Sequence, residues 1–282
     1  MKYIIICLIG LFIVSCSNES DEYGWNRDKL KGKVKSFSEF SYKAKERFGK
    51  IEKGKRERER EYWKDYQNRY NERGNKIEEK EYNSNGSLYS KGISKYDEQG
   101  NEIEGNRYSS DGSLENKWIY KYDKQGNCIE SNRYKSDGSF EYKVINKYDE
   151  QGNQIESNDY DSDGGLDYKW IYKYDKQGNC IESNCYESDG GLFFKSIYKY
   201  DEQGNEIESN WYNSDGSLPS KNTYKYDEQG NEIEKKEYNA DGSLDFKYTY
   251  KYEFDEDGNW IKKIIFKNET PVYVLEREYE YY

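Results

Sequence analysis

"KYDEQGNEIE" occupies residues 95–104 and recurs unchanged at 199–208 and 225–234. Its first tyrosine belongs to a series in which each member follows the last by 26 residues: Tyr96, Tyr122, Tyr148, Tyr174, Tyr200 and Tyr226. Weaker copies at Tyr70 and Phe254 extend the series to eight units. A fixed period of this length is typical of a repeat array and not of a single compact core.

Each unit contains two turn signals. "YDEQGN" places Asp ahead of two polar residues and a Gly, which suits a type I turn closed by a left-handed Gly. "SDGS" provides a second signal about thirteen residues later, and alternating segments such as "KWIYKY" lie between the two. The sequence therefore predicts an all-β fold, an antiparallel meander of β-hairpins with two strands in each 26-residue unit.

The turns also predict which side chains share a face of the sheet. Around the turn at 123–127, simple pairing places Trp118 opposite Asn132 and puts Trp118, Tyr122 and Glu130 on one aromatic face, which we expect to point inward or to a concave side. Laterally aligned positions then recur every 24 residues, two fewer than the period of 26. One residue of slip per strand implies a strand tilt of roughly 35–45°, so we expect the sheet to coil into a spiral or shell.

The composition narrows the classes of function. The chain has no His, which removes Ser-His and Cys-His nucleophile pairs and the commonest zinc ligand. Its net charge is -11, although residues 27–64 carry 15 Lys or Arg against 7 Asp or Glu. An acidic array repels nucleic acid, and the run "KGKRERER" at 53–60 alternates its signs from Arg56 onward, as a solvated strand does. We expect no catalytic activity, no cofactor, no metal and no nucleic-acid partner.

The N-terminal residues have the features of a targeting signal. Lys2 precedes an apolar run from Tyr3 to Val14, which is too short to span a bilayer and has the length of a signal-peptide core. "IVSC" resembles the bacterial lipobox, which implies a diacylglyceryl group on Cys16, palmitate-type acylation and cleavage just before that residue. The acidic "SNESDE" that follows resembles the export signal of Bacteroidetes surface lipoproteins, and implies an outer-membrane protein anchored by lipid and exposed on the surface.

The repeat has a resemblance of its own. "YKYDEQGNEIE" followed by "YNSDGSL" resembles the YD repeats of Rhs proteins, teneurins and toxin-complex shells, over about residues 62–266. Asn replaces the usual Arg after Gly, the period is longer, and no toxin or protease core follows. Shorter repeat proteins similar to bacterial MORN-like antitoxins are a second match. The expected organisation is a signal peptide (1–15), an acidic tether (16–29), a basic N-terminal capping hairpin (30–61), the array (62–266) and a C-terminal capping strand (267–282).

Two further motifs favour structural roles. "DYDSDGGLD" at 159–167 is similar to a calcium loop, but Trp170 stands where an EF-hand needs Glu, so we predict a turn. Cys128 and Cys180 hold the same place two units apart, roughly 19 Å at the strand spacing, and we predict that Cys185 points to the opposite face from Cys180. A disulfide needs much closer Cα atoms, so we predict free thiols.

Comparison of the units separates a constant frame from variable places. The turn Gly and the Glu of "IE" barely change, whereas the place of Trp118 and the place of Arg133 vary from unit to unit. By the simple register each Trp lies beside a Glu, an arrangement that holds sugars through stacking and hydrogen bonds. The predicted ligand-binding residues are Trp118, Trp170, Glu104, Glu156, Tyr142 and Tyr168. We expect a surface scaffold that binds a glycan or a protein partner. The alternatives are a structural spacer or assembly protein, and an antitoxin or immunity-like repeat protein.

Overall fold

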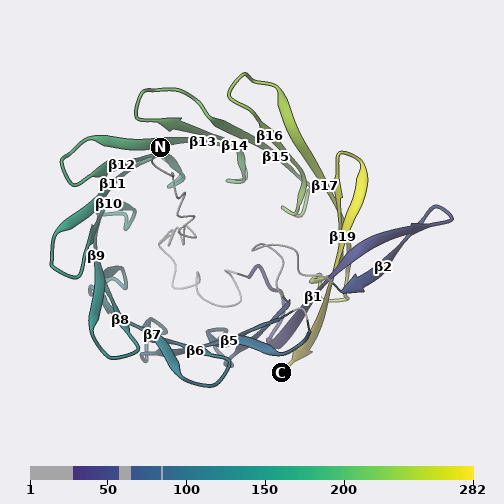
Figure 1. The fold of residues 1–282 in the computed structure, drawn as a ribbon, viewed down its shortest axis with the longest axis horizontal. Coiled ribbons are helices and arrows are strands. Elements are labelled where there is room, and N and C mark those ends of the chain that lie inside the picture. Colours follow the sequence, from purple (N-terminus) through teal and green to yellow (C-terminus); the bar gives the residue numbers. More distant parts are fainter. Residues whose placement is uncertain (1–27, 57–64, 84) are drawn as a thin grey trace.

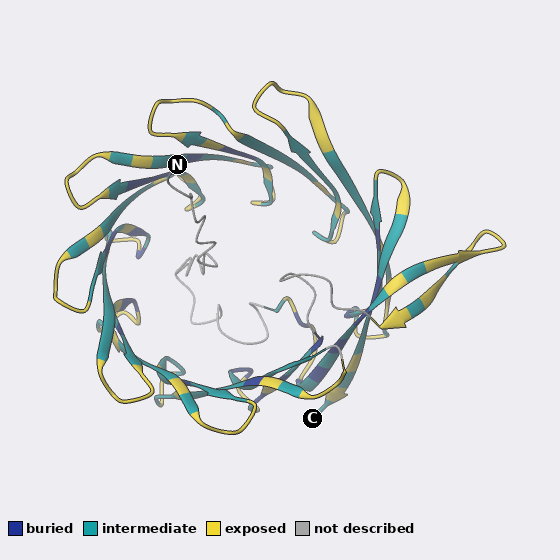
Figure 2. Ribbon diagram, in the orientation of Figure 1, coloured by how far each residue is buried: buried dark blue, intermediate teal, exposed yellow. Residues whose placement is uncertain are grey.

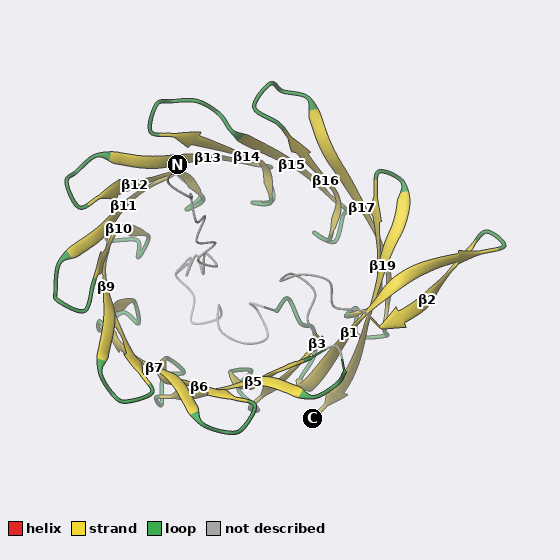
Figure 3. Cartoon of the chain, viewed as in Figure 1, coloured by secondary structure: helices red, strands yellow, loops and turns green. Residues whose placement is uncertain are grey.

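The computed structural model describes residues 28–56, 65–83 and 85–282, and the regular structure in these ranges is entirely β-strand (Figure 3). Nineteen strands form one antiparallel sheet. The predicted all-β class and hairpin meander are confirmed. The lipobox cysteine, Cys16, lies outside the described residues.

Strand bounds follow the repeat, since each unit's first strand ends at the Tyr before the Asp turn. The strands are β1 (Val34–Arg47), β2 (Lys50–Arg56), β3 (Asp65–Tyr70), β4 (Lys76–Tyr82), β5 (Leu88–Tyr96), β6 (Glu102–Ser109), β7 (Leu114–Tyr122), β8 (Cys128–Lys135), β9 (Phe140–Tyr148), β10 (Gln154–Tyr160), β11 (Leu166–Tyr174), β12 (Cys180–Glu187), β13 (Leu192–Tyr200), β14 (Glu206–Asn213), β15 (Ser220–Tyr226), β16 (Glu232–Tyr238), β17 (Leu244–Phe254), β18 (Trp260–Lys267) and β19 (Thr270–Tyr281).

The turn after β7 shows why the Asp-x-x-Gly-Asn pattern recurs. The Asp123 amide donates to the Asn127 carbonyl at 2.9 Å, and the Gly126 amide donates back to the Asp123 carbonyl at 3.3 Å. The Asp123 carboxylate accepts from the amides of Gln125 and Asn127 at 2.8 and 2.9 Å. Gly126 has φ 91°, a left-handed conformation that other residues adopt at a cost. The sequence thus specifies this turn residue by residue.

The sheet closes into a barrel. β1 pairs with β19 along one edge and with β3 along the other, so eighteen strands form a ring from which β2 stands apart (Figure 1). The expected spiral or shell is therefore wrong. The predicted capping segments pair with each other, from Val34 opposite Tyr281 to Lys43 opposite Tyr273. Closure satisfies the backbone groups that two free edge strands would leave unpaired.

The predicted slip of one residue per strand is confirmed. The predicted faces of the even-numbered strands, which follow the Asp turns, are wrong. Trp118 pairs with Arg133, which pairs with Tyr142, so aligned positions recur every 24 residues as expected. Near the turn, however, Tyr122 pairs with Cys128 whereas Lys121 pairs with Glu130, and Ile129 is left over as a β-bulge. A bulge shifts all later residues of its strand to the other face.

The aromatic face of the first strand in each repeat unit points into the barrel. The described chain that precedes β1 lies within the ring in Figure 1. Its Asp28 accepts hydrogen bonds from the Tyr70 hydroxyl and from Asn68 Nδ2, the latter at 3.2 Å. Tyr70 holds the place of Tyr122 in its unit, so the Tyr122 series shares this inward face. The expectation of an inward aromatic face is met for Trp118 and Tyr122, but not for Glu130.

The apolar core is small and sits at the seam between the chain ends. Leu30, Val34, Phe37 and Tyr70 form one buried cluster there. Elsewhere most strand residues are half-buried, and full exposure gathers in the turns and in the β1–β2 hairpin (Figure 2). A wide barrel cannot fill its interior with side chains, so the described ring depends on its backbone ladder and on side-chain contacts along the wall.

Candidate ligand-binding wall of the barrel

Glu104 and Glu156 lie on the outer face of the barrel, away from the tryptophans. Glu104 pairs with Ile119, while Trp118 pairs with Gly105 and points the opposite way. Two units later, Glu156 likewise pairs with Ile171. The prediction that these carboxylates lie beside Trp118 and Trp170 is wrong, because the bulge after each Asp turn reverses the even strands.

The outer glutamates form a ladder of ion pairs. Glu104 lies 2.8 Å from Lys95 Nζ and 2.9 Å from Lys117 Nζ, on the strands to either side. Glu156 repeats this geometry with Lys147 and Lys169 at 2.8 and 3.0 Å. Hydrogen bonds from these lysines, the strand-end Lys first, lower the pKa of each carboxyl to about 2. The ladder is satisfied within the fold and is a structural feature.

The variable places of the repeat meet on the inner face. The bulges make the Trp118 series and the Arg133 series direct cross-strand partners, although the simple register put them on opposite faces. The pairs are Gly92 with Arg107, Trp118 with Arg133, Val144 with Asp159, Trp170 with Cys185, Ser196 with Trp211, and Asn222 with Glu237. Variation is therefore concentrated on one surface, which we call the inner wall.

An aromatic patch covers part of this wall. Trp170 stacks on Tyr172 with ring centroids 6.3 Å apart and meets Phe194 edge-on at 5.1 Å. Phe194 stacks in turn on Trp211 at 6.4 Å. Trp211 keeps 43% of its surface exposed. The patch is thus a continuous apolar surface across β11, β13 and β14 with an accessible edge.

Asp159 places a carboxyl group beside the aromatic patch. It pairs with Tyr168 on the neighbouring strand, so the predicted residue Tyr168 does lie on the inner wall. Burial raises the pKa of Asp159 to about 6, and a hydrogen bond from the Trp170 side chain opposes that rise. This carboxyl can accept or donate a hydrogen bond near neutral pH.

Trp118 and Tyr142 form a second, cationic part of the wall. The Arg133 guanidinium lies 5.2 Å from the Trp118 ring and 5.5 Å from the Tyr142 ring. Its Nε lies 3.1 Å from a Glu141 carboxylate oxygen. The predicted residues Trp118 and Tyr142 are brought together, with an arginine between them in place of the predicted glutamate.

Sequence reasoning missed Arg133, Asp159 and Trp211 as members of the same surface. Their variability was visible in the repeat, but their face was assigned from simple alternation. The exposed Ile that follows each turn, such as Ile129 at 37%, marks the bulge and reverses that assignment. Simple alternation places the hydrophobic Ile129 on the outer face and the charged Glu130 on the inner face, and this inverted arrangement was the available signal.

The remaining sequence motifs have structural roles. The predicted turn within 159–167 is confirmed, with Asp161 Oδ1 accepting from the amides of Asp163 and Gly165 at 2.9 and 2.8 Å. Cys128, Cys180 and Cys185 are free thiols, as predicted. The predicted opposite faces of Cys180 and Cys185 are wrong: these residues pair with Tyr174 and Trp170, both on the inner face, because the bulge falls between them.

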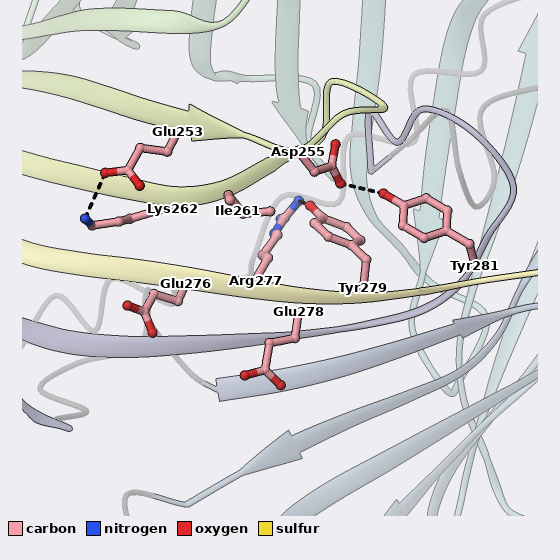
Figure 4. A pocket seen from close by; sticks show the side chains of 9 residues that line it. All are labelled: Glu253, Asp255, Ile261, Lys262, Glu276, Arg277, Glu278, Tyr279 and Tyr281. Carbon is pink, nitrogen blue, oxygen red and sulfur yellow. Dashed lines mark hydrogen bonds and ion pairs between the residues drawn. The ribbon is translucent and has the colours of Figure 1, made fainter.

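A hollow of about 640 Å³ lies at the seam, lined by residues of β17, β18 and β19 (Figure 4). Most of its charged groups already have partners: Lys262 lies 2.8 Å from Glu253, and the Tyr281 hydroxyl donates to Asp255 at 2.6 Å. Glu276 is held by Lys53 at 2.7 Å. These contacts tie the last strands together and assign the hollow to barrel closure.

Comparisons with known proteins add little to this geometry. No protein-family model and no curated protein matches the sequence. A porin-like protein from Bacteroides uniformis superposes with a TM-score of 0.46 at 9% identity, covering 88% of this chain and 98% of its own. The Photorhabdus luminescens Tc holotoxin pore gives 0.35 at 17% identity, over 74% of this chain but 11% of its own. Both TM-scores are below 0.5, and the barrel architecture is therefore assigned from this chain's own strand pairing. In the described part of the chain, no helix could cross a membrane.

Proposed function

We propose that this protein is a lipid-anchored protein of the cell envelope whose barrel binds a glycan on its inner wall, without catalysing a reaction. One observation carries the proposal. The places that vary between units pair with one another on the inner wall, while the outer ladder of Lys and Glu is nearly constant. A constant frame with variable residues on one surface is the pattern of a recognition array.

The chemistry of the wall favours a sugar ligand. Tryptophan and tyrosine rings offer flat apolar faces with polar edges, and Trp170 and Trp211 lie in one continuous patch through Phe194. Asp159 supplies a hydrogen-bonding carboxyl group at the patch, and Arg133 supplies donors beside Trp118. A few polar groups set among aromatic side chains are typical of specific ligand sites.

The proposed location rests on two features. The lipobox-like "IVSC" at 13–16 supports a lipid anchor on Cys16 and attachment to the outer membrane. The outer face of the barrel carries Lys–Glu ion pairs on successive hairpins, whereas a barrel wall set in lipid presents an apolar band about 25 Å tall. The charged face favours contact with water over contact with hydrocarbon chains, so the anchor rather than the wall would hold the protein at the membrane.

The test is a glycan array, followed by calorimetric titration of the best ligand. The chain from Ser17 onward retains every described strand and is the parent protein. We expect Trp170→Ser combined with Trp211→Ser to lose most of its glycan affinity. Trp211 is partly exposed and Ser196 already stands in the place of Trp170 one unit later, so the melting temperature should change little.

The matched control is Tyr212→Ser. Tyr212 adjoins Trp211 in the chain but pairs with Lys195, on the outer face. It should keep full affinity. A double variant that binds as well as the parent would refute the role of the aromatic patch. A parent that binds no glycan would refute the proposal and favour the structural spacer.

A further inference from the structure

The β1–β2 hairpin projects beyond the barrel. The last pair that joins β1 to β19 is Lys43 with Tyr273, and four more β1–β2 pairs follow it, from Ala44 with Lys53 to Arg47 with Lys50. At about 3.3 Å per residue the projection extends roughly 13 Å. Figure 1 shows the hairpin standing away from the ring, and Figure 2 shows it largely exposed.

The tip of this hairpin presents a phenylalanine to solvent. Phe48 is fully exposed, at 105% of its reference surface, while the next most exposed large hydrophobic residue described is Tyr282 at 50%. Phe48 also has φ 51° and Gly49 has φ 74°, so the two form a turn with both central residues in the left-handed region. Asn-Gly is the usual solution for such a turn, and a bulky aromatic residue there is strained. Neither burial nor turn geometry explains this residue.

Basic side chains surround the tip. Residues 43–56 hold seven Lys or Arg against two Glu, a net charge of +5 in a chain whose net charge is -11. Lys45, Arg47, Lys50 and Lys55 are all exposed. The projection of roughly 13 Å exceeds the Debye length of about 8 Å at physiological salt, so the acidic barrel is largely screened from whatever the tip approaches.

We propose that the hairpin 43–56 docks on an anionic lipid surface, with Phe48 inserted into the headgroup region and the exposed Lys45, Arg47, Lys50 and Lys55 against lipid phosphates. An apolar residue flanked by cations is the chemistry that lies at a bilayer interface. Charge complementarity selects an anionic surface over a neutral one. The contact is independent of the inner wall and adds a second attachment to the one expected at Cys16.

Vesicle co-sedimentation of the chain from Ser17 onward, which lacks Cys16, tests the proposal. The parent should bind phosphatidylcholine vesicles that contain phosphatidylglycerol, and binding should weaken with added salt. Phe48→Asn should lower the partition coefficient about tenfold or more, the ratio that corresponds to burying one Phe side chain. Because Asn suits the left-handed turn, the same variant should melt at or above the parent temperature.

A charge variant and its control complete the experiment. Arg47→Gln with Lys50→Gln should abolish the preference for phosphatidylglycerol, whereas Lys124→Gln with Lys176→Gln, at exposed turns of the barrel, should not. Undiminished vesicle binding by Phe48→Asn would overturn the proposal. So would a parent that leaves anionic vesicles unbound, a result that would instead favour an acidic protein as the partner of the hairpin.

Discussion

Arg277 should be the side chain on which barrel closure depends most. It belongs to β19, and its Nε lies 2.8 Å from a Glu39 carboxylate oxygen on β1. Its guanidinium also stacks over the rings of Phe37 and Trp260, at 4.4 and 4.0 Å from their centroids. The two charged side chains are only 11% and 9% exposed. Arg277→Met removes the cation and leaves the buried Glu39 carboxylate with a hydrogen bond from the Tyr66 hydroxyl but with no cationic partner.

The expected cost follows from these contacts. Breaking one partner of a buried ion pair costs about 3–5 kcal/mol, and each lost cation–ring contact adds about 0.5–2 kcal/mol. The Met side chain fills the same space and restores part of the lost contact with the two rings. We therefore expect the free energy of unfolding to fall by about 4–6 kcal/mol in all. The free energy of unfolding of ordinary domains is about 5–15 kcal/mol. A loss of this size should therefore leave the variant only marginally stable.

Urea unfolding followed by tryptophan fluorescence measures this change. The control is Lys121→Met, which removes an ion pair of similar length, 2.7 Å to Glu130, from a side chain that is 60% exposed. That variant should unfold at nearly the same urea concentration as the parent. Adding Glu39→Leu to Arg277→Met should restore part of the stability, since the buried Glu39 charge is removed with its cation, while the Tyr66 hydroxyl loses both of these partners. A cost for Arg277→Met no larger than that for Lys121→Met would refute the reasoning.

Two further predictions concern pH and the anchor. Burial raises the pKa of Asp159 to about 6, whereas the carboxyl group of the unfolded chain titrates near 3.9, so the folded protein binds this proton more tightly. The resulting stabilisation of the folded state falls by about 2 kcal/mol as pH rises from 4.5 to 7. Asp159→Asn should flatten that slope in urea midpoints, and an unchanged slope would contradict the assignment. Cys16→Ala should release the protein from membranes and abolish labelling by palmitate, whereas labelling that persists would exclude Cys16 as the lipidated residue.

The repeat unit could be read from the sequence because its determinants are local. Asp123, Gly126 and Asn127 specify a five-residue turn through hydrogen bonds within the turn itself. Strand bounds follow from the turns, and the slip of 24 against 26 residues follows from the spacing of two turns. Each of these properties involves neighbours in the chain, so a single unit contains the information.

The faces of the even-numbered strands depend on a β-bulge, which simple alternation of side chains does not predict. One extra residue, Ile129, enters the ladder just past the turn, and it moves Glu130 outward and Arg133 inward. The bulge leaves the slip between units unchanged because every turn carries the same insertion. The predicted sugar site therefore combined tryptophans that lie on the inner wall with glutamates that lie on the outer face, and Asp159 lies beside Trp170 where Glu156 was expected.

Closure was decided only by the tertiary structure. β1 and β19 lie outside the repeat, and their pairing joins residues more than two hundred positions apart, such as Phe37 with Tyr279. Whether a tilted sheet meets its own first strand depends on the number of strands, the slip and the curvature together. No unit contains that information. The sequence specified how each hairpin forms and leans on the next, and the sum over eighteen strands made the ring.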